Sequence, residues 1–358
     1  MRFQGKKLTV SVFGQSHGAA IGAVIDGLPA GFRVDRERLL AFMSRRAPGQ
    51  GRFTTARRET DEPEFLSGMI DGVTCGAPVC AVIRNGDTKS KDYEAFRQTP
   101  RPSHADYPAL VKYGESYDIR GGGPFSGRLT APLCVSGGIA LQMLEEKGIR
   151  IGAHIATISN QADRRFDPVR VSAADFEQIL ANGFPTLSRE AGEEMMAEIE
   201  EARKAEDSVG GTVEAAALGL PVGLGGPLFE GLESSLGAAL FAIPAVKGVE
   251  FGDGFFAALL RGSRHNDPYA MSEGKVVTKT NHAGGLTGGM TNGMPLIFRV
   301  AFKPTPSIGQ VQQSVNLADG TETELVIRGR HDPCVVTRAV PVVEAVTALV
   351  LLDEVLSA

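Results

Sequence analysis

Residues 8–27, LTVSVFGQSHGAAIGAVIDG, contain two apolar stretches with a short polar loop between them. Residues 8–13 and 21–25 are rich in β-branched side chains, and the Asp26-Gly27 pair after the second stretch is a turn signal. Two short strands so close together predict a hairpin-like pair and not a strand–helix–strand unit.

Helices and further strands follow this pair in irregular order. Asp35 is a suitable N-cap for a helix in which Leu39, Leu40 and Met43 recur at helical spacing. Other helices are predicted at residues 133–147, stopped by Gly148, from Ser188 to about 206, and at 342–356; other strands are predicted at 79–83, 149–158, 212–220 and 296–302. No stretch resembles a linker, so the pattern predicts a single α+β domain over residues 1–358.

Composition excludes several classes of protein. The net charge of −5 argues against general nucleic-acid binding, which needs a basic surface. The four cysteines show no metal-binding spacing, and no apolar stretch is long enough for a membrane span or a signal peptide. We therefore expect a cytoplasmic protein with no bound metal, no nucleic acid and no membrane.

Three histidines lie in polar loops: His17 in GQSHG, His104 in RPSHAD and His331 in GRHDP. A loop histidine is most often a surface residue, but beside a ligand it can transfer a proton near neutral pH. GQSHG also fits the GxSxG pattern of hydrolases, with Ser16 at its centre. That nucleophile elbow requires a helix after the serine, and here a second strand is predicted, so a hydrolase is disfavoured.

Arginines concentrate in SRRAPGQGRFTTARRETDE, residues 44–62, where glycines and threonines separate them. Arginine pairs bidentately with phosphate and carboxylate, so the segment suits a substrate with several negative groups, although a solvated charged face would look alike.

Three further segments could hold a ligand: RGGGPFSGR (120–128), GGLTGG (284–289) and KPTPS (303–307). None is a Walker or Rossmann motif, and structural turns remain an equal alternative for the glycine segments. KPTPS, with one cation and two hydroxyls after a strand, suits a phosphate, although a plain turn would look the same.

Seven ordered motifs together resemble the signatures of the chorismate synthase family, from about residue 8 to residue 355: GQSHG, RRAPGQGRFTTARRETDE, RPSHADY, RGGGPFSGRLTA, NHAGGLTGGMTNGMP, KPTPSI and GRHDPCVVTRAVPVVEA. The resemblance implies an anti-1,4-elimination of phosphate from 5-enolpyruvylshikimate-3-phosphate, which yields chorismate. It also implies a requirement for reduced FMN without net redox change. The family fold is a βαβ sandwich with helices between antiparallel sheets, usually assembled as a homotetramer. An external reductant supplies the reduced flavin, and NADP is among the ligands associated with the family.

The resemblance also assigns roles to single residues. His17 matches the histidine that protonates the departing phosphate region, and His104 matches the one that holds a proton near the flavin. Asp332 matches the aspartate that helps to take up the substrate's C6 proton. The expected substrate contacts are Ser16, Arg45, Arg46, Arg52, Arg128 and Arg330. The expected cofactor contacts are Arg46, Arg52, Pro124, Phe125, Ser126, Pro244, Ala245, Gly288, Lys303, Pro304, Thr305, Pro306, Ser307 and Arg330.

Three positions depart from the family pattern. Gln15 stands where glutamate is more usual, and Ser103 stands where glycine is usual. Pro124 stands where many members have an arginine, which removes a cation from the predicted flavin loop; Arg120 or Arg128 could compensate.

Without the resemblance, the residues alone indicate an enzyme with a polyanion site, acid–base histidines and glycine-rich loops. One alternative is a phosphoryl or enolpyruvyl transferase, which should not bind FMN. Another is an RNA-binding protein without catalysis. The acidity and the aromatic share of 6%, with no tryptophan for base stacking, count against that alternative.

Overall fold

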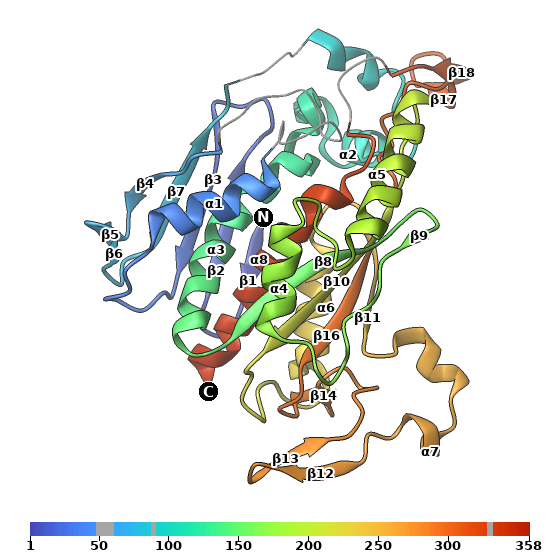
Figure 1. Cartoon of the computed structure of the whole chain (residues 1–358). Helices are drawn as coiled ribbons and strands as arrows, with labels where there is room; N and C mark the ends of the chain where they lie inside the picture. Colours follow the sequence, from blue (N-terminus) through green and yellow to red (C-terminus); the bar gives the residue numbers. More distant parts are fainter. Residues whose placement is uncertain (48–60, 87–90, 328–331) are drawn as a thin grey trace.

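The computed structural model describes residues 1–47, 61–86, 91–327 and 332–358. Two five-stranded antiparallel sheets lie on either side of a layer of helices (Figure 1). The predicted fold class, α+β with helices between antiparallel sheets, is confirmed.

The first sheet has the strand order β1-β2-β3-β7-β4. Its centre is the predicted hairpin-like pair, β2 (Thr9–Gly14) and β3 (Ala20–Asp26), in which Val12 lies opposite Ala23. The loop between the two strands carries Ser16 and His17, so a strand follows this serine and the geometry of a nucleophile elbow is absent. The other strands are β1 (Arg2–Gln4), β7 (Val79–Arg84) and β4 (Glu64–Ser67).

The second sheet has the strand order β11-β16-β10-β8-β9. Helix α8 packs on β8 and β10 within the sandwich, and α4 and α5 pack on β8 from outside. The central strands are almost continuously buried. The bounds are β11 (Val246–Phe251), β16 (Leu296–Phe302), β10 (Gly211–Leu218), β8 (Arg150–Ile158) and β9 (Gln161–Ala162).

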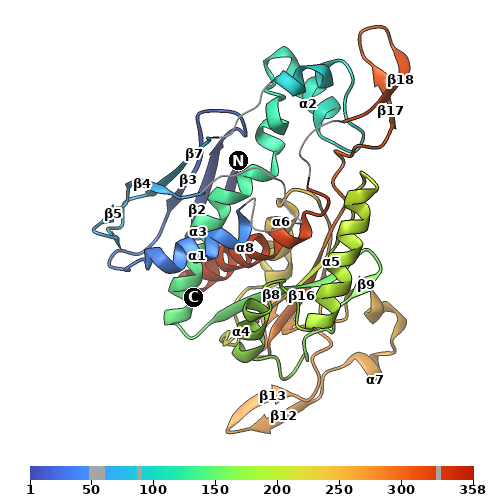
Figure 2. The same cartoon turned by 45° about the horizontal axis from the view of Figure 1, so that its top comes forward.

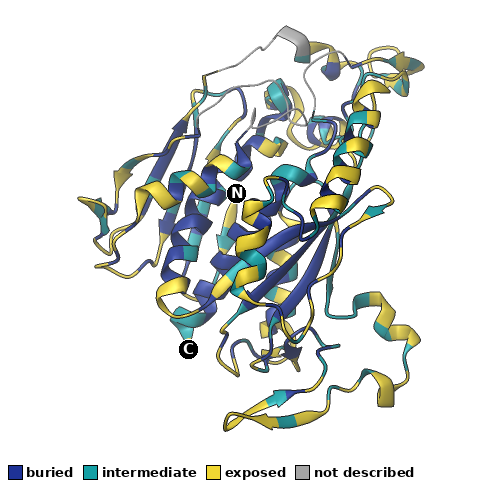
Figure 3. Ribbon diagram, viewed as in Figure 1, coloured by how far each residue is buried: buried dark blue, intermediate teal, exposed yellow. Residues whose placement is uncertain are grey.

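Four helices make the layer between the sheets: α1 (Arg36–Arg46), α3 (Thr130–Glu146), α6 (Leu232–Phe241) and α8 (Val336–Ser357). Helix α3 packs on the first sheet, α8 packs on the second, and the two helices pack on each other. They can approach closely because Gly137 of α3 lies against Ala345 of α8, where a larger residue would overlap it. Figure 3 shows that this layer and the sheet faces towards it contain most of the buried residues.

Local signals at helix ends are confirmed. The Asp35 carboxylate accepts a hydrogen bond from the Arg38 amide, and the Ser188 hydroxyl accepts one from Ala191. Gly148, just after α3, has a φ of +77°, the left-handed conformation that favours glycine at this place. Helix α8 begins six residues earlier than predicted. Pro341 lies in its second turn, where the missing N–H removes one backbone hydrogen bond without ending the helix.

The remaining elements are smaller. The other helices are α2 (Asp106–Tyr113), α4 (Ala173–Ala181), α5 (Arg189–Lys204) and α7 (Gly262–His265). The 3-10 helices are η1 (Lys91–Arg97), η2 (Gly114–Ser116), η3 (Arg120–Phe125), η4 (Gly127–Leu129), η5 (Leu228–Glu230) and η6 (Gly254–Leu259). Two-stranded sheets pair β5 (Met69–Ile70) with β6 (Val73–Thr74), β12 (Tyr269–Ser272) with β13 (Lys275–Thr278), β14 (Leu286–Thr287) with β15 (Met290–Thr291), and β17 (Gln312–Asn316) with β18 (Thr321–Leu325).

A cap of η1, α2 and the β17–β18 hairpin lies at one end of the sandwich (Figure 2). It has its own small core, in which Phe96, Tyr117 and Ile327 pack together. At the opposite end, residues 252–280 project as an exposed arm that carries α7, β12 and β13 (Figures 1 and 3). None of the helices in the described part of the chain has the length and apolarity needed to cross a membrane.

Candidate active site

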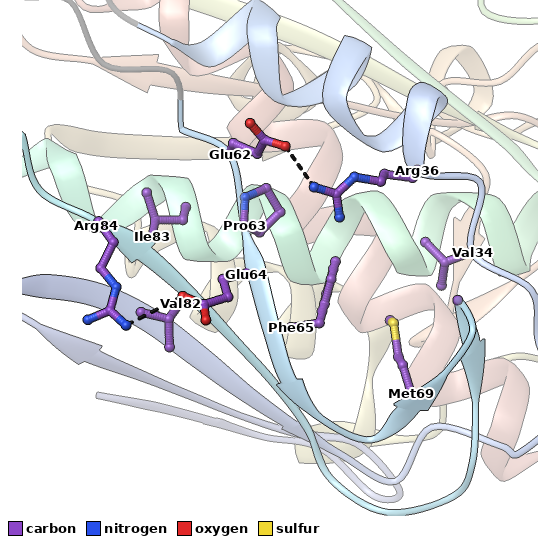
Figure 4. A pocket seen from close by; sticks show the side chains of 11 residues that line it. Val34, Arg36, Glu62, Pro63, Glu64, Phe65, Met69, Val82, Ile83 and Arg84 are labelled. Atoms are coloured by element: carbon purple, nitrogen blue, oxygen red, sulfur yellow. Dashed lines mark hydrogen bonds and ion pairs between the residues drawn. The ribbon is translucent and has the colours of Figure 1, made fainter.

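Two large hollows differ sharply in chemistry. One, of 720 Å³, lies between α1 and β4 and is shown in Figure 4. Its charged side chains pair with one another, Arg36 with Glu62 at 2.7 Å and Arg84 with Glu64 at 3.4 Å. Among the predicted catalytic, substrate and cofactor residues that the structure describes, none lines it. The other hollow, of 690 Å³, contains most of them and is the candidate site.

The candidate site lies where the cap meets the sandwich. Its walls come from the cap and its glycine turn, from the C-terminal end of α6 with the residues after it, from the segment after β16, and from the start of α8. The structure thereby brings together these predicted site residues: His104, Pro124, Phe125, Ser126, Pro244, Ala245, Lys303, Thr305, Pro306, Ser307 and Asp332. Pro304 belongs to the same segment but is not among the lining residues.

A turn of three glycines separates the two predicted catalytic histidines. Gly121, Gly122 and Gly123 have φ values of +61°, +82° and +51°, which glycine adopts without strain. A methyl group at Gly121 would overlap the His17 ring, and one at Gly122 would lie 3.3 Å from Nε2 of His104. His17 is not a lining residue, but it contacts Gly121, which is.

His17 and Ser16 are both buried beside this turn. The His17 ring packs edge-on against Tyr93, with 5.2 Å between ring centroids. The Ser16 hydroxyl has no hydrogen-bond partner among the described residues. A buried hydroxyl without a partner is costly in a folded protein, and such a group suits ligand contact.

His104 is partly exposed and forms a cluster with the buried side chains of Asp106 and Arg101. Its Nδ1 lies 2.7 Å from the Asp106 carboxylate, which Arg101 binds through Nε at 2.7 Å and Nη2 at 2.8 Å. Burial lowers the pKa of His104, Asp106 raises it, and the positive charges of Arg101 and Lys303 lower it further, so the net direction is downward. Burial alone would raise the pKa of Asp106, but hydrogen bonds from Arg101 and His104 bring it well below its usual value.

The KPTPS segment follows β16 directly into the cavity. Lys303 Nζ donates to the Ser103 carbonyl at 3.1 Å, and Arg101 Nη1 donates to the Ser307 hydroxyl at 3.3 Å. The Thr305 hydroxyl is buried without a hydrogen-bond partner in the described part of the chain. Ser103 itself has a φ of +58°, which explains in physical terms why glycine is favoured there.

Asp332 lies beside the start of α8. Its carboxylate accepts a hydrogen bond from Arg338 Nη1 at 2.8 Å, and Arg338 Nε donates to the Arg46 carbonyl at 2.9 Å. Arg338 also lines the cavity, so this pair places one negative and one positive group on the same wall.

The predicted substrate arginines that the structure describes do not line the cavity. Arg45 binds Glu344 bidentately, at 2.6 and 2.9 Å. Arg46 and Arg128 are both buried and share the carboxylate of Asp61. Burial and the nearby Arg338 lower the pKa of Arg46 to about 10, although Asp61 opposes this. Arg52, Arg330 and His331 lie outside the described residues.

Gly288 is a predicted cofactor residue that lies away from the cavity. It forms the turn between β14 and β15, and its neighbour Gly289 contacts Gly231, the N-cap of α6. The cavity lies at the other end of α6, and ten helical residues span about 15 Å. Gly288 is not among the residues that line it.

Arg120 and Arg128 were the two candidates to replace the cation that is missing at Pro124, but neither lines the cavity. Arg120 pairs with Asp118 at 2.8 Å, and Arg128 pairs with Asp61. Among the described residues, the arginine and lysine side chains that line the cavity are those of Arg101, Lys303 and Arg338.

Sequence reasoning assigned no site role to Arg101, Asp106, Tyr93 or Arg338. Arg101 and Asp106 flank His104 in RPSHAD, and their closeness in sequence was the available signal. Tyr93 and Arg338 reach the site only through tertiary packing, which no local pattern reveals. In the part of the chain that the structure describes, no group of three or more His, Cys, Asp or Glu side chains could hold a metal ion.

Three comparisons with known proteins give the same family, and each match covers nearly the whole chain. A family model described as chorismate synthase matches residues 8–356. The chorismate synthase of Thermococcus gammatolerans is 50% identical over 354 residues, which cover 99% of this chain and 97% of that protein. That of Lancefieldella parvula is 46% identical over 360 residues, covering 98% and 94%. A solved structure described as the crystal structure of chorismate synthase has a TM-score of 0.78 and 28% identity, covering 99% and 93%.

Proposed function

The chain belongs to the chorismate synthase family, and from this premise we propose that it converts 5-enolpyruvylshikimate-3-phosphate to chorismate and phosphate with reduced FMN. The observation that carries the proposal is the cavity in which His104, Asp332 and KPTPS meet, in a chain matched by the family over residues 8–356. In the reaction the C–O bond to phosphate breaks, a proton leaves C6, and a new double bond forms. When bound, reduced FMN would supply electron density for this elimination, which involves no net redox change.

The residues of the cavity fit a flavin. Its 690 Å³ lies in the usual range for a ligand pocket. Phe125, Pro244 and Ala245 offer apolar surface. Lys303 and the Thr305 hydroxyl, which has no hydrogen-bond partner among the described residues, suit a phosphate or ring oxygen. We assign Ser126, Pro304, Pro306 and Ser307 to the same ligand.

Proton transfer is assigned to three side chains. His17, buried beside the glycine turn, donates to the departing phosphate, and Asp332 assists removal of the C6 proton. His104 binds the flavin. Its lowered pKa favours a neutral imidazole before the ligand arrives, and an anionic ligand beside it favours uptake of a proton.

The substrate's negative groups require cations. Arg52 and Arg330 remain the proposed contacts from the family resemblance. Arg46 and Arg128 act in this proposal from behind the lining, where the two buried guanidinium groups share one carboxylate, that of Asp61, and so contribute positive potential. Arg45, which pairs with Glu344, lies behind the lining with them.

An anaerobic assay tests the proposal. The enzyme is given 5-enolpyruvylshikimate-3-phosphate with and without chemically reduced FMN, and chorismate and phosphate are measured together. Equal formation of both, only with reduced FMN, supports it. Folded enzyme that binds FMN but yields neither product, also after Pro124→Arg, contradicts it. Phosphate transfer without flavin favours the transferase alternative, and salt-sensitive RNA binding without flavin binding favours the RNA-binding alternative.

We also propose a homotetramer, supplied with electrons by an external reductant; the NADP expected from the family belongs to that reduction. Exposed apolar side chains on the arm, among them Phe255, Leu259 and Met271, support self-association. All four cysteines are free thiols, which suits a reducing cytoplasm. Light scattering tests the assembly, and a monomeric mass at micromolar concentration contradicts it.

A further inference from the structure

We propose that Asp106 is the positioning residue of His104: it holds the proton on Nδ1, so that Nε2 faces the cavity as a proton acceptor. The inference rests on the proposed function for its meaning in catalysis, but the position of the proton can be measured without any turnover.

Asp106 is held in one orientation from two sides. Its Oδ2 accepts from the Arg101 amide at 3.1 Å and from Arg101 Nε at 2.7 Å. Its Oδ1 accepts from Arg101 Nη2 at 2.8 Å and lies 2.7 Å from His104 Nδ1. The carboxyl group is fully buried, and its bonds to Arg101 favour the ionised form. An ionised carboxylate can only accept hydrogen bonds, so Nδ1 of His104 must carry the hydrogen.

The other ring nitrogen then has a defined role. Nε2 faces the glycine turn at Gly122, beside the cavity that His104 lines. Among the described residues, the polar contacts of the His104 ring are made by Nδ1, with Asp106 and with Arg101. Nε2 of the neutral ring is therefore an acceptor directed towards the space in which a ligand would lie.

The charged groups around the ring limit its protonation. Arg101 Nη2 lies 3.1 Å from Nδ1, and the positive charge of Lys303 also acts on the ring. Among the described groups with the largest effects on His104, Asp106 favours the imidazolium, and Arg101 and Lys303 oppose it. The cluster thus keeps His104 neutral until a ligand with negative charge arrives, and at that point Nε2 can take a proton.

A purely structural role for the same cluster is the rival explanation. Arg101 connects the loop to Ser307 and stacks its guanidinium 4.5 Å from the Phe96 ring centre. On that view Asp106 stabilises the cap and has no influence on the tautomer of His104.

Neutron diffraction on deuterated crystals of the ligand-free enzyme separates the two views. In the wild type we expect deuterium on Nδ1 of His104 and none on Nε2. In Asp106→Asn the amide oxygen should take the Oδ2 position, because two Arg101 donors point at it. The amide NH₂ then faces Nδ1 and forces the hydrogen onto Nε2. Deuterium on Nε2 in the wild type, or an unchanged tautomer in Asp106→Asn, overturns the proposal.

Turnover provides the second readout. Asp106→Asn should lower kcat by between about 10-fold and 10⁴-fold, the upper end matching loss of the correct histidine tautomer in hydrolytic triads, with little change in KM. Asp106→Glu should recover part of the loss. Asp319→Asn, which makes the same change at an exposed aspartate in the turn of the cap's β17–β18 hairpin, should stay within about 2-fold. Full kcat in Asp106→Asn, or equal losses in Asp106→Asn and Asp319→Asn, contradicts the proposal.

The two hypotheses can fail separately. If the wild type makes no chorismate but shows the expected tautomer, the proposed function fails and the positioning role stands. If Asp106→Asn does not fold, the wild-type diffraction data and Asp106→Glu still decide.

Discussion

His154 of β8 and Glu214 of β10 are opposite residues in neighbouring strands, and Nε2 of the buried imidazole lies 3.1 Å from the Glu214 carboxylate. The other ring nitrogen, Nδ1, lies 3.0 Å from Asp163. Across the same sheet, Arg299 of β16 lies opposite Glu214, and Glu250 of β11 lies opposite Arg299. Charges therefore alternate along a row that crosses four strands, with ion pairs between Arg299 and both glutamates.

This row should make the stability of the fold depend on pH. Burial alone lowers the pKa of His154, but its bonds to Asp163 and Glu214 outweigh burial and raise it. The stabilisation from His154 is therefore fully present below its unfolded pKa of about 6.5 and is lost as pH rises through the raised folded value. The unfolding free energy should fall on the alkaline side by up to about 1.4 kcal/mol per pH unit.

Urea unfolding at a series of pH values measures this fall. His154→Gln should remove the part of it that belongs to His154, whereas His265→Gln, in α7, should retain it. Equal pH profiles for both variants and the wild type would refute the role of His154. On the acid side the pKa values of Asp163 and Glu214 are lowered, so their stabilisation is present above their unfolded pKa values and is lost as pH falls through the folded ones.

Removal of Glu214 should be strongly destabilising. In Glu214→Ala, His154 and Arg299 keep their burial but lose a shared carboxylate, and breaking a buried pair in this way costs about 3–5 kcal/mol. Glu193→Ala, which removes an exposed pair with Arg189, should cost no more than about 1 kcal/mol. The unfolding free energies of both variants in urea check this, and a loss below about 1 kcal/mol for Glu214→Ala would show that the row contributes little.

Loss of either predicted catalytic histidine should lower turnover while the protein remains folded. Both His17→Ala and His104→Ala remove a side chain that can exchange a proton near neutral pH, and such a loss costs roughly 10–10⁴-fold. The chorismate assay with reduced FMN gives the turnover, and circular dichroism checks folding. Full turnover in both variants would remove the assigned roles.

The sequence predicted what local signals determine. Asp35, Ser188 and Gly148 mark helix ends through bonds to nearby backbone or through their own φ, and all three are confirmed. The neighbours Arg45 and Arg46 were predicted together as anion contacts, yet one pairs with Glu344 and the other with Asp61. These partners depend on the packing of α1 against α8 and on the chain after residue 60, which local patterns cannot show.

The same limit explains the site. The motifs predicted which segments would gather, and His104, Ser126, Lys303 and Asp332 do line one cavity. They could not show that Asp106 would bind both His104 and Arg101, because that depends on how the loop folds back on itself. They also could not show that Gly288 would lie at the far end of α6.

Gly121→Ala should disturb the glycine turn between the two histidines. The added methyl group would overlap His17 and lie 2.7 Å from the Ser16 hydroxyl, so the turn or the His17 ring must move. Gly148→Ala has a similar backbone cost at a φ of +77°, but open space around it, and should lose about 1 kcal/mol of stability with normal turnover. Turnover and urea unfolding of both variants separate the two effects; equal turnover in both would show that the turn does not position His17.

Lys303 should bind the negative part of the flavin. It lines the cavity. Burial, together with the positive charge of Lys247, lowers the pKa of its ammonium group, so an anionic ligand close by would stabilise the charged form. Lys303→Met keeps the length of the side chain and removes the charge, so FMN affinity should fall about 10-fold, equivalent to about 1.4 kcal/mol.

Lys247→Met removes a neighbouring exposed charge that does not line the cavity, and affinity should change by no more than about 2-fold. Quenching of FMN fluorescence at two salt concentrations measures both. Equal losses in the two variants that vanish at high salt would mean that only the general positive potential matters, and unchanged affinity in Lys303→Met would mean that the flavin lies elsewhere.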